Sequence, residues 1–330
     1  MGGDLWCRGR EKRKHVFLGL MCGSVTVLLS LITAALFGTG DFCGGVASRR
    51  APLWLVVGGA HFVGLLGVAL AALLVAPIPG GRDLALGALG GLFGLVGLGL
   101  LYRGLAVGPM QVVAPITAIA SAAGPIVWSL VAGETLPWTV WLGVTVALPA
   151  IGLVSWAPNE ESSTGGGITA TTLVGALGAG VGFAGFFIAL DATSEASAPW
   201  PVVSSRVASV TVLALGVGAY FLTRRQQLAA AERGIAGELL EALRSGDGRH
   251  GGFWGVVTLI VLAGITDSLA NVGFLYAVQF GQLAVVAVLT SLYPIATAAW
   301  ARVVLDERLT RPQTIGFVGA LLASGLLAVG

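Results

Sequence analysis

GQLAVVAVLTSLYPIATAAWARVVLDE, residues 281–307, is the stretch that indicates the fold, because an earlier stretch of the same length resembles it. Residues 108–134 read GPMQVVAPITAIASAAGPIVWSLVAGE, again with Gly first and Glu last. Both follow a Leu-Tyr pair, which ends at Tyr102 in the first copy and at Tyr276 in the second. The distance between the copies far exceeds the period of a solenoid repeat, so the pattern indicates duplication of half a protein.

The composition is that of a membrane protein. Of the 330 residues, 56% are hydrophobic and only 10% are charged, whereas a soluble domain carries about 25% charged residues. The formal net charge of +2 gives no reason to expect a nucleic-acid partner. The three cysteines lack metal-ligand spacing, and no cofactor is expected.

Ten apolar stretches approach the length of about 20 residues that a helix needs to cross a bilayer. They are residues 24–47, 54–77, 84–107, 110–132, 137–156, 168–191, 199–222, 253–276, 281–305 and 312–329. The predicted fold class is therefore an all-α membrane protein with ten transmembrane helices. Five helices per half is an odd number, so the halves must insert in opposite senses and form two inverted repeats.

The predicted organisation places the two repeats between polar segments. These are a basic tail with the start of the first apolar run (1–23), repeat one (24–156), an acidic and Gly-rich linker (157–167) and repeat two (168–330). Within repeat two, residues 223–252 carry many charges, with several leucines on one helical face. This pattern predicts an amphipathic helix on the membrane surface.

An even number of spans puts both termini on the same side of the membrane. With the N-terminus inside, the basic tail and Arg82 are cytoplasmic, but Arg49, Arg50 and the arginines of 223–252 and 306–311 lie outside. The positive-inside rule therefore favours the reverse unless the first helix dominates. The charge bias alone leaves the orientation open.

Three stretches resemble the EamA type of the drug/metabolite transporter superfamily, and particularly its actinobacterial branch. They are GDFCGGVASRRAP at 40–52, LLYRGLAVGPMQVVAPI at 100–116 and SLYPIATAAWARVVLDERLT at 291–310. The resemblance implies a ten-helix carrier of the inner or plasma membrane with cytoplasmic termini, commonly an exporter of small metabolites or drugs. It names no cargo, and a homodimer remains open. The first copy has Ile119-Ala120-Ser121 where the second has Leu-Tyr-Pro, so it departs from the pattern there.

Ionisable side chains inside a bilayer are costly and therefore indicate function. Asp267 and Asn271 lie four residues apart in the stretch TDSLANVGF, so they share one helical face. The equivalent residues of the first half, Phe93 and Gly97, are not polar. We expect Asp267 to take up a proton or bind a cationic group while Asn271 orients the cargo; the alternative is a hydrogen bond between helices.

Arg206 and Asp41 are further charged candidates. Arg206 could pair with Asp191 or with Asp267, hold an anionic group of the cargo, or extend to the membrane interface. Asp41 is a carboxyl group inside the first predicted helix. A substrate or proton pathway could use any of these groups.

The remaining candidates are aromatic. His61 could handle protons or be a hydrogen-bonded packing residue. Trp128 and Trp300 could line a cavity and stack on the cargo, or pack in the core. Tyr102 and Tyr276, from the duplicated Leu-Tyr pairs, complete the expected pathway. The cavity is predicted between the helices at 24–47, 54–77, 168–191, 199–222 and 253–276.

Several enzyme classes lack their motifs. The sequence contains no P-loop, no His-Glu-x-x-His and no Gly-x-Ser-x-Gly. Gly38-Thr39-Gly40-Asp41 matches the Gly-x-Gly-Asp pattern of intramembrane aspartyl proteases, but the Tyr-Asp that accompanies it is missing. The prediction is therefore a secondary transporter, coupled to protons, with a small-molecule substrate and lipid neighbours. A lipid flippase or a membrane-embedded enzyme acting on a lipid-linked substrate is the alternative.

Overall fold

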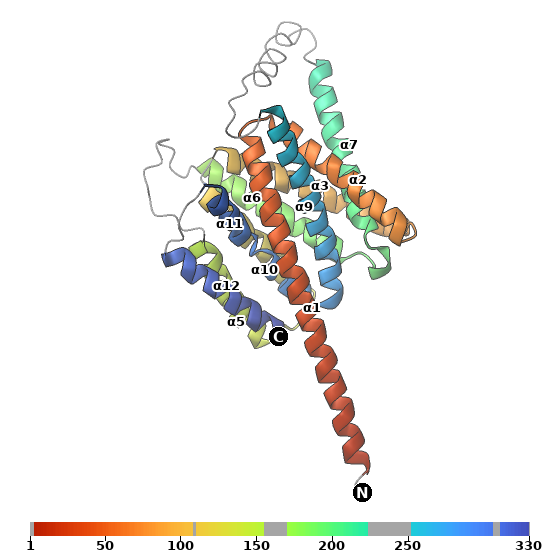
Figure 1. Ribbon diagram of the computed structural model, residues 1–330. Coiled ribbons are helices and arrows are strands. Elements are labelled where there is room, and N and C mark those ends of the chain that lie inside the picture. The colour runs from red at the N-terminus through yellow and green to blue at the C-terminus, as the bar shows by residue number, and fades with distance from the viewer. Residues whose placement is uncertain (1–2, 108–109, 155–169, 224–251, 306–310, 330) are drawn as a thin grey trace.

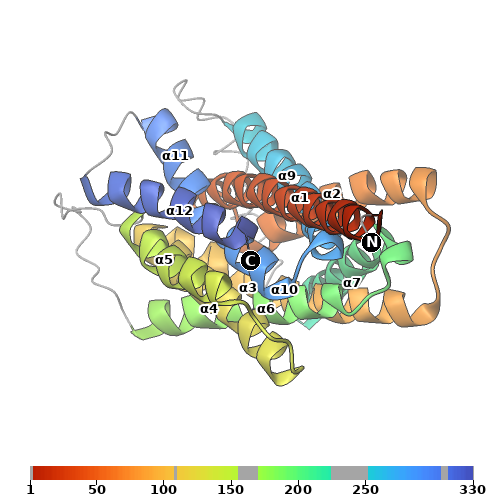
Figure 2. The same ribbon diagram turned by 90° about the horizontal axis from the view of Figure 1, so that it is seen from below.

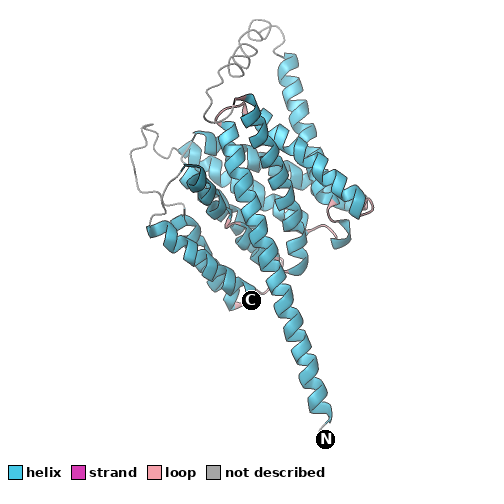
Figure 3. Ribbon diagram, viewed as in Figure 1, coloured by secondary structure: helices cyan, strands magenta, loops and turns pink. Residues whose placement is uncertain are grey.

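The chain folds into a bundle of helices, and the described residues contain no strand (Figures 1 and 3). The structure is a computed structural model that describes residues 3–107, 110–154, 170–223, 252–305 and 311–329. The helices of the first half are α1 (Gly3–Ser48), α2 (Leu53–Val75), α3 (Gly81–Val107), α4 (Met110–Val131) and α5 (Trp138–Val154). Those of the second half are α6 (Ala170–Asp191), η1 (Glu195–Ser197), α7 (Trp200–Thr223), α9 (Phe253–Phe280), α10 (Leu283–Thr290), α11 (Tyr293–Leu305) and α12 (Arg311–Val329).

Within the described ranges, eight segments are long and apolar enough to cross a membrane, and two further apolar helices are shorter. The eight are Gly23–Ser48, Leu53–Val75, Gly81–Val107, Val113–Val131, Ala170–Asp191, Trp200–Thr223, Phe253–Phe280 and Leu283–Trp300. The short ones, Trp138–Leu153 and Thr314–Leu327, correspond to the last helix predicted for each half. Large apolar side chains are exposed along the bundle, as a lipid-facing surface requires. The protein is therefore a multi-pass membrane protein.

The predicted segments outside these helices are only partly described. Helix α1 begins at Gly3, so the basic residues of the expected tail belong to the same helix as the first span. The linker 157–167 lies outside the described residues, as does the expected surface helix of 223–252 apart from Thr223, the last residue of α7. Figure 1 shows the beginning of α1 and the end of α12 at the same end of the bundle.

The most extensive helix packing joins the two halves (Figure 2). Helix α1 packs on α9 and α11, α2 on α7 and α9, α3 on α6 and α7, α4 on α6, and α5 on α12. Glycine allows this close approach: a Cβ at Gly91 of α3 would overlap the backbone of Ser205 in α7. Without water to drive the packing of apolar faces, such small residues let membrane helices meet backbone to backbone.

The helix predicted for 281–305 is broken in its middle, which corrects that expectation. Helix α10 ends at Thr290, Ser291 and Leu292 form a turn, and α11 begins at Tyr293. Pro294 contributes to the break, since it has no N–H to donate to the carbonyl group one turn earlier. The matching helix α4 stays continuous although it contains Pro115 and Pro125.

Two apolar clusters fill the bundle. One includes Tyr102 and Tyr293 and is built mainly from α3, α4, α5, α10 and α12. The other includes Phe187 and Phe274, from α6 and α9. Phe37 of α1 and Phe183 of α6 pack against both clusters, so the boundary between them lies in the middle of the bundle.

Candidate functional site

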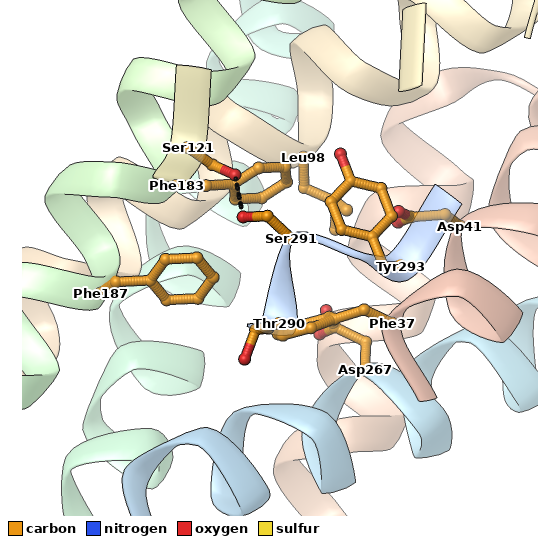
Figure 4. A pocket seen from close by; sticks show the side chains of 10 residues that line it. All are labelled: Phe37, Asp41, Leu98, Ser121, Phe183, Phe187, Asp267, Thr290, Ser291 and Tyr293. Atoms are coloured by element: carbon orange, nitrogen blue, oxygen red, sulfur yellow. Dashed lines mark hydrogen bonds between the residues drawn. The ribbon is translucent and has the colours of Figure 1, made fainter. Parts of the chain in front are cut away.

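A cavity of two lobes lies at this boundary, and Figure 4 shows the residues that line the first lobe. The lobes have cavity volumes of about 20 Å³ each, and they share the residues Phe37, Leu98, Phe183, Phe187 and Asp267. The first lobe adds Asp41, Ser121, Thr290, Ser291 and Tyr293. The second lobe adds His61, Gly91, Gly94, Phe186, Arg206 and Asn271. The five helices predicted to form the cavity all contribute, together with α3, α4 and the break between α10 and α11.

Arg206 of α7 forms an ion pair with Asp267 of α9 at the second lobe. The two side chains are only 5% and 13% exposed. Of the alternatives that the sequence left open for Arg206, the structure shows pairing with Asp267, not with Asp191. The pair balances both charges deep in the bundle, where either ion alone would be costly.

Asn271 lies one turn beyond Asp267, as the spacing predicts, and it also lines the second lobe. Its amide nitrogen donates a hydrogen bond to the backbone carbonyl of Asp267 over 2.7 Å. A carbonyl oxygen can only accept, so this bond fixes the orientation of the amide group. The amide oxygen is therefore directed away from the helix backbone, and it has no hydrogen-bond partner among the described residues.

His61 of α2 is joined to the ion pair through Ser209. Its Nδ1 lies 2.7 Å from Ser209 Oγ, and that hydroxyl group lies 3.1 Å from the backbone oxygen of Arg206. His61 is 2% exposed and lines the same lobe as Arg206. The residue is thus hydrogen-bonded, as one of the two interpretations expected, and it lies beside the charged centre; proton handling by His61 stays a prediction.

Asp41 of α1 lines the first lobe and is 6% exposed. No described residue forms an ion pair or a hydrogen bond with its carboxyl group. In Figure 4 the carboxyl group lies beside the ring of Tyr293, apart from Asp267. The cavity therefore holds one carboxyl group paired with a cation and a second one without such a partner.

Hydrogen bonds and ring stacking join the helices around the cavity. Tyr102 donates from its hydroxyl group to the carbonyl of Gly40 over 3.3 Å, and Tyr293 to that of Ala114 over 3.1 Å. The rings of Phe187 and Phe274 stack with their centroids 4.2 Å apart. The two hydrogen bonds join α3 to α1 and α11 to α4, and the stacked rings join α6 to α9. Helices that are distant in the sequence are therefore held together around the cavity.

Five predicted pathway residues, Tyr102 among them, line neither lobe. Trp128 and Trp300 are 49% and 42% exposed, which corrects the expectation that they line the cavity. In a bundle whose outer surface is apolar, these indoles face outward, and Trp300 donates to Thr39 Oγ1 over 2.7 Å. Asp191 is the half-buried last residue of α6, and Tyr276 packs against the cluster around Phe274.

Sequence reasoning missed the aromatic wall of the cavity. Phe37, Phe183 and Phe187 line both lobes, and Phe186 lines the second. Phe37 lies four residues before Asp41, and Phe183 lies four before Phe187, so each pair shares a helical face. That spacing was the available signal in the sequence. It did not stand out, because these helices are apolar on all faces.

Comparison with known proteins gives a family for the second half of the chain. The model of the EamA-like transporter family matches residues 170–329. No curated protein matches the sequence. A crystal structure titled only as that of a protein aligns with a TM-score of 0.65, at 13% identity, over 91% of this chain and 94% of its own. At that identity the alignment shows a shared fold and carries no activity over to this chain.

Proposed function

Residues 170–329 make this chain an EamA-type member of the drug/metabolite transporter family, and from this premise we propose that it is a secondary carrier of a small molecule. The observation that carries the proposal is the cavity between the halves, which the buried Arg206–Asp267 pair lines. Ionisable groups inside a membrane bundle are typical of substrate and ion pathways. The carrier works by alternating access, opening the cavity to one side of the membrane at a time.

The helix packing supports two repeats related by a twofold exchange. Each helix of the first half can be matched in order with one of the second half: α1 with α6, α2 with α7, α3 with α9, α4 with α10–α11, and α5 with α12. When the matched helices are exchanged, each major packing pair becomes another major packing pair or stays the same. The pair α1–α9 becomes α6–α3, α2–α9 becomes α7–α3, and α1–α11 becomes α6–α4, while α2–α7 and α5–α12 map onto themselves. Such symmetry is what inverted-repeat transporters use to alternate between two equivalent closures.

The broken helix adds a second supporting feature. Its turn at Ser291 and Leu292 borders the first lobe, and Ser291 Oγ lies 3.2 Å from Ser121 Oγ of α4 (Figure 4). Discontinuous helices in carriers occur where irregular backbone lines a cavity. We assign this turn to the part of the bundle that moves when the cavity opens.

Asp41 is the group that we assign to proton coupling. A buried carboxylate without a cation beside it is costly, and uptake of a proton removes the charge. Asp267 is already neutralised by Arg206. Its role, revised from the proton carrier suggested by the sequence, is to hold Arg206 in the cavity wall.

The proposal is tested with the purified full chain in liposomes under an imposed pH gradient. A panel of amino acids, nucleobases, sugars and organic cations is screened for a compound that dissipates the gradient. We expect one to do so with the unaltered protein and not with Asp41→Asn, which cannot carry the proton. Flux without proton movement in both proteins would refute the coupling, and absence of flux for every compound together with lipid scrambling would favour a flippase.

The enzyme alternative would require a cluster of catalytic groups. Among the described residues there is no group of three or more His, Cys, Asp or Glu side chains that could hold a catalytic metal ion. Asp41 and Asp267 line one cavity, but Arg206 occupies Asp267, so the two carboxyl groups do not share a proton as a protease pair does. This arrangement fits a binding cavity better than a hydrolytic centre.

A further inference from the structure

Two residues that line the second lobe each have a buried polar atom to which no described residue is hydrogen-bonded. The two atoms are Nε of Arg206, whose side chain bonds Asp267 through its terminal nitrogen, and Oδ1 of Asn271. The residues are 5% and 3% exposed, and both line the same lobe. Buried polar atoms are nearly always hydrogen-bonded, so an unmet donor and an unmet acceptor in one lobe indicate a ligand that meets both.

The chemistry of these two atoms defines the edge of that ligand. Arg206 Nε–H can only donate, and Asn271 Oδ1 can only accept. The ligand must therefore present one acceptor and one donor. An amide edge, in which C=O and N–H are neighbours, supplies both without a charge.

The electrostatics of the lobe also favour an uncharged ligand. Asp267 already balances the charge of Arg206, so an anion finds no free positive charge here. Asp41 lines the other lobe only, so a cation bound at Asn271 would not contact it. The free-energy cost of burying a charged ligand without a counter-ion would exceed the stabilisation from its hydrogen bonds to Arg206 and Asn271.

The walls of the lobe are aromatic. Phe37, Phe183, Phe186 and Phe187 all line it, and the rings of Phe37 and Phe187 pack against each other with their centroids 6.2 Å apart. Aromatic side chains favour stacked or edge-on contact with another ring. The cavity volume of this lobe is about 20 Å³, so a ring enters it only when the phenylalanine side chains move apart as the carrier opens.

We propose that the second lobe binds a planar, uncharged aromatic compound bearing an amide edge, such as a carboxamide or a heterocyclic lactam. This inference rests on the proposed function, because it names the substrate class of the same cavity. Asn271 Oδ1 accepts a hydrogen bond from the N–H group of the ligand, Arg206 Nε–H donates one to its carbonyl oxygen, and the phenylalanines contact the ring. His61, whose Nε2 is bonded to no described residue, borders the same lobe.

Equilibrium binding of three pyridines to the full chain in nanodiscs tests this site. Nicotinamide has the amide edge, 3-acetylpyridine keeps the carbonyl group but lacks the N–H, and nicotinate is an anion. We expect nicotinamide to bind roughly tenfold more tightly than 3-acetylpyridine, since a missing partner leaves Asn271 Oδ1 unsatisfied. Nicotinate should bind more weakly than nicotinamide.

Two variants locate the site. Asn271→Leu, which keeps the side-chain size, should remove the preference for nicotinamide over 3-acetylpyridine. Phe187→Leu should weaken both compounds, whereas the matched change Phe317→Leu, at an exposed position of α12, should weaken neither. If Asn271→Leu fails to fold, the contrast between Phe187→Leu and Phe317→Leu still decides whether the ring binds in this cavity.

Three outcomes would overturn the site: tighter binding of nicotinate, an unchanged preference in Asn271→Leu, or no binding of any of the three compounds by folded protein. Transport in liposomes separates this failure from failure of the carrier. Flux of another solute without pyridine binding would refute the site and keep the carrier. Amide-selective binding without flux of any tested solute would keep the site and refute the carrier.

Discussion

Replacing Asp267 with Leu should destabilise the protein strongly, because Arg206 would remain buried without its counter-ion. Arg206 is 5% exposed, so solvent reaches little of the guanidinium group and cannot replace the lost carboxylate. Breaking one side of such a buried pair costs about 3–5 kcal/mol. For a chain of this size that corresponds to a melting temperature lower by about 4–7 °C.

The assay is thermal unfolding of purified variants in one detergent, followed by the loss of monodisperse protein. The double variant Arg206→Met with Asp267→Leu removes both charges and should recover most of the lost stability, because an apolar pair of similar volume replaces the ion pair. Asp191→Asn, at the half-buried end of α6, serves as the control and should change stability by less than about 0.5 kcal/mol. The reasoning would be refuted if Asp267→Leu unfolded like the unaltered protein, or if the double variant were no more stable than Asp267→Leu.

Three further changes test other contacts of the fold. Gly91→Ala should cost about 1–3 kcal/mol by overpacking α3 against α7, while Gly99→Ala, where an added Cβ meets nothing within 4 Å, should be neutral or slightly stabilising in the same unfolding assay. Tyr293→Phe loses the hydrogen bond from the hydroxyl group to Ala114 O, so we expect the free energy of unfolding to fall by about 1 kcal/mol. A cysteine placed in the cavity should then react faster with a water-soluble thiol reagent. An unchanged labelling rate would contradict a role of this bond in keeping the cavity closed. Trp300→Phe should leave transport within about twofold of normal, because the indole faces outward, and a tenfold loss would return Trp300 to the pathway.

The helices could be predicted closely from the sequence because a bilayer sets their length. Residues 54–77 and 84–107 were expected to be helical, and the structure has Leu53–Val75 and Gly81–Val107. The break after Thr290 could not be predicted in the same way. Its flanks are uniformly apolar, and prolines also occur inside the continuous helix α4.

Part of the candidate site was also visible in the sequence. Charge inside an apolar helix is costly, so Asp41, Arg206 and Asp267 stood out from their surroundings, and the structure brings them to one cavity. The partner of Arg206 could not be chosen between Asp191 and Asp267, because that choice depends on which helices pack together. The indole groups of Trp128 and Trp300 gave no such signal, since a helix that is apolar on all sides does not reveal which side faces lipid.

The packing of each half on the other has a consequence for how the protein is made. Neither half forms its main helix contacts by itself. Helix α1 packs mainly on α9, and α3 packs mainly on α6 and α7, so these contacts form only after the second half has been synthesised. During synthesis the first five helices are therefore inserted in the membrane before the second half has been made. In that interval the helices of the second half do not yet cover Asp41 and His61. We expect this interval to be the step at which the nascent chain depends most on insertion chaperones, and a chain truncated before α6 to be removed by membrane proteases.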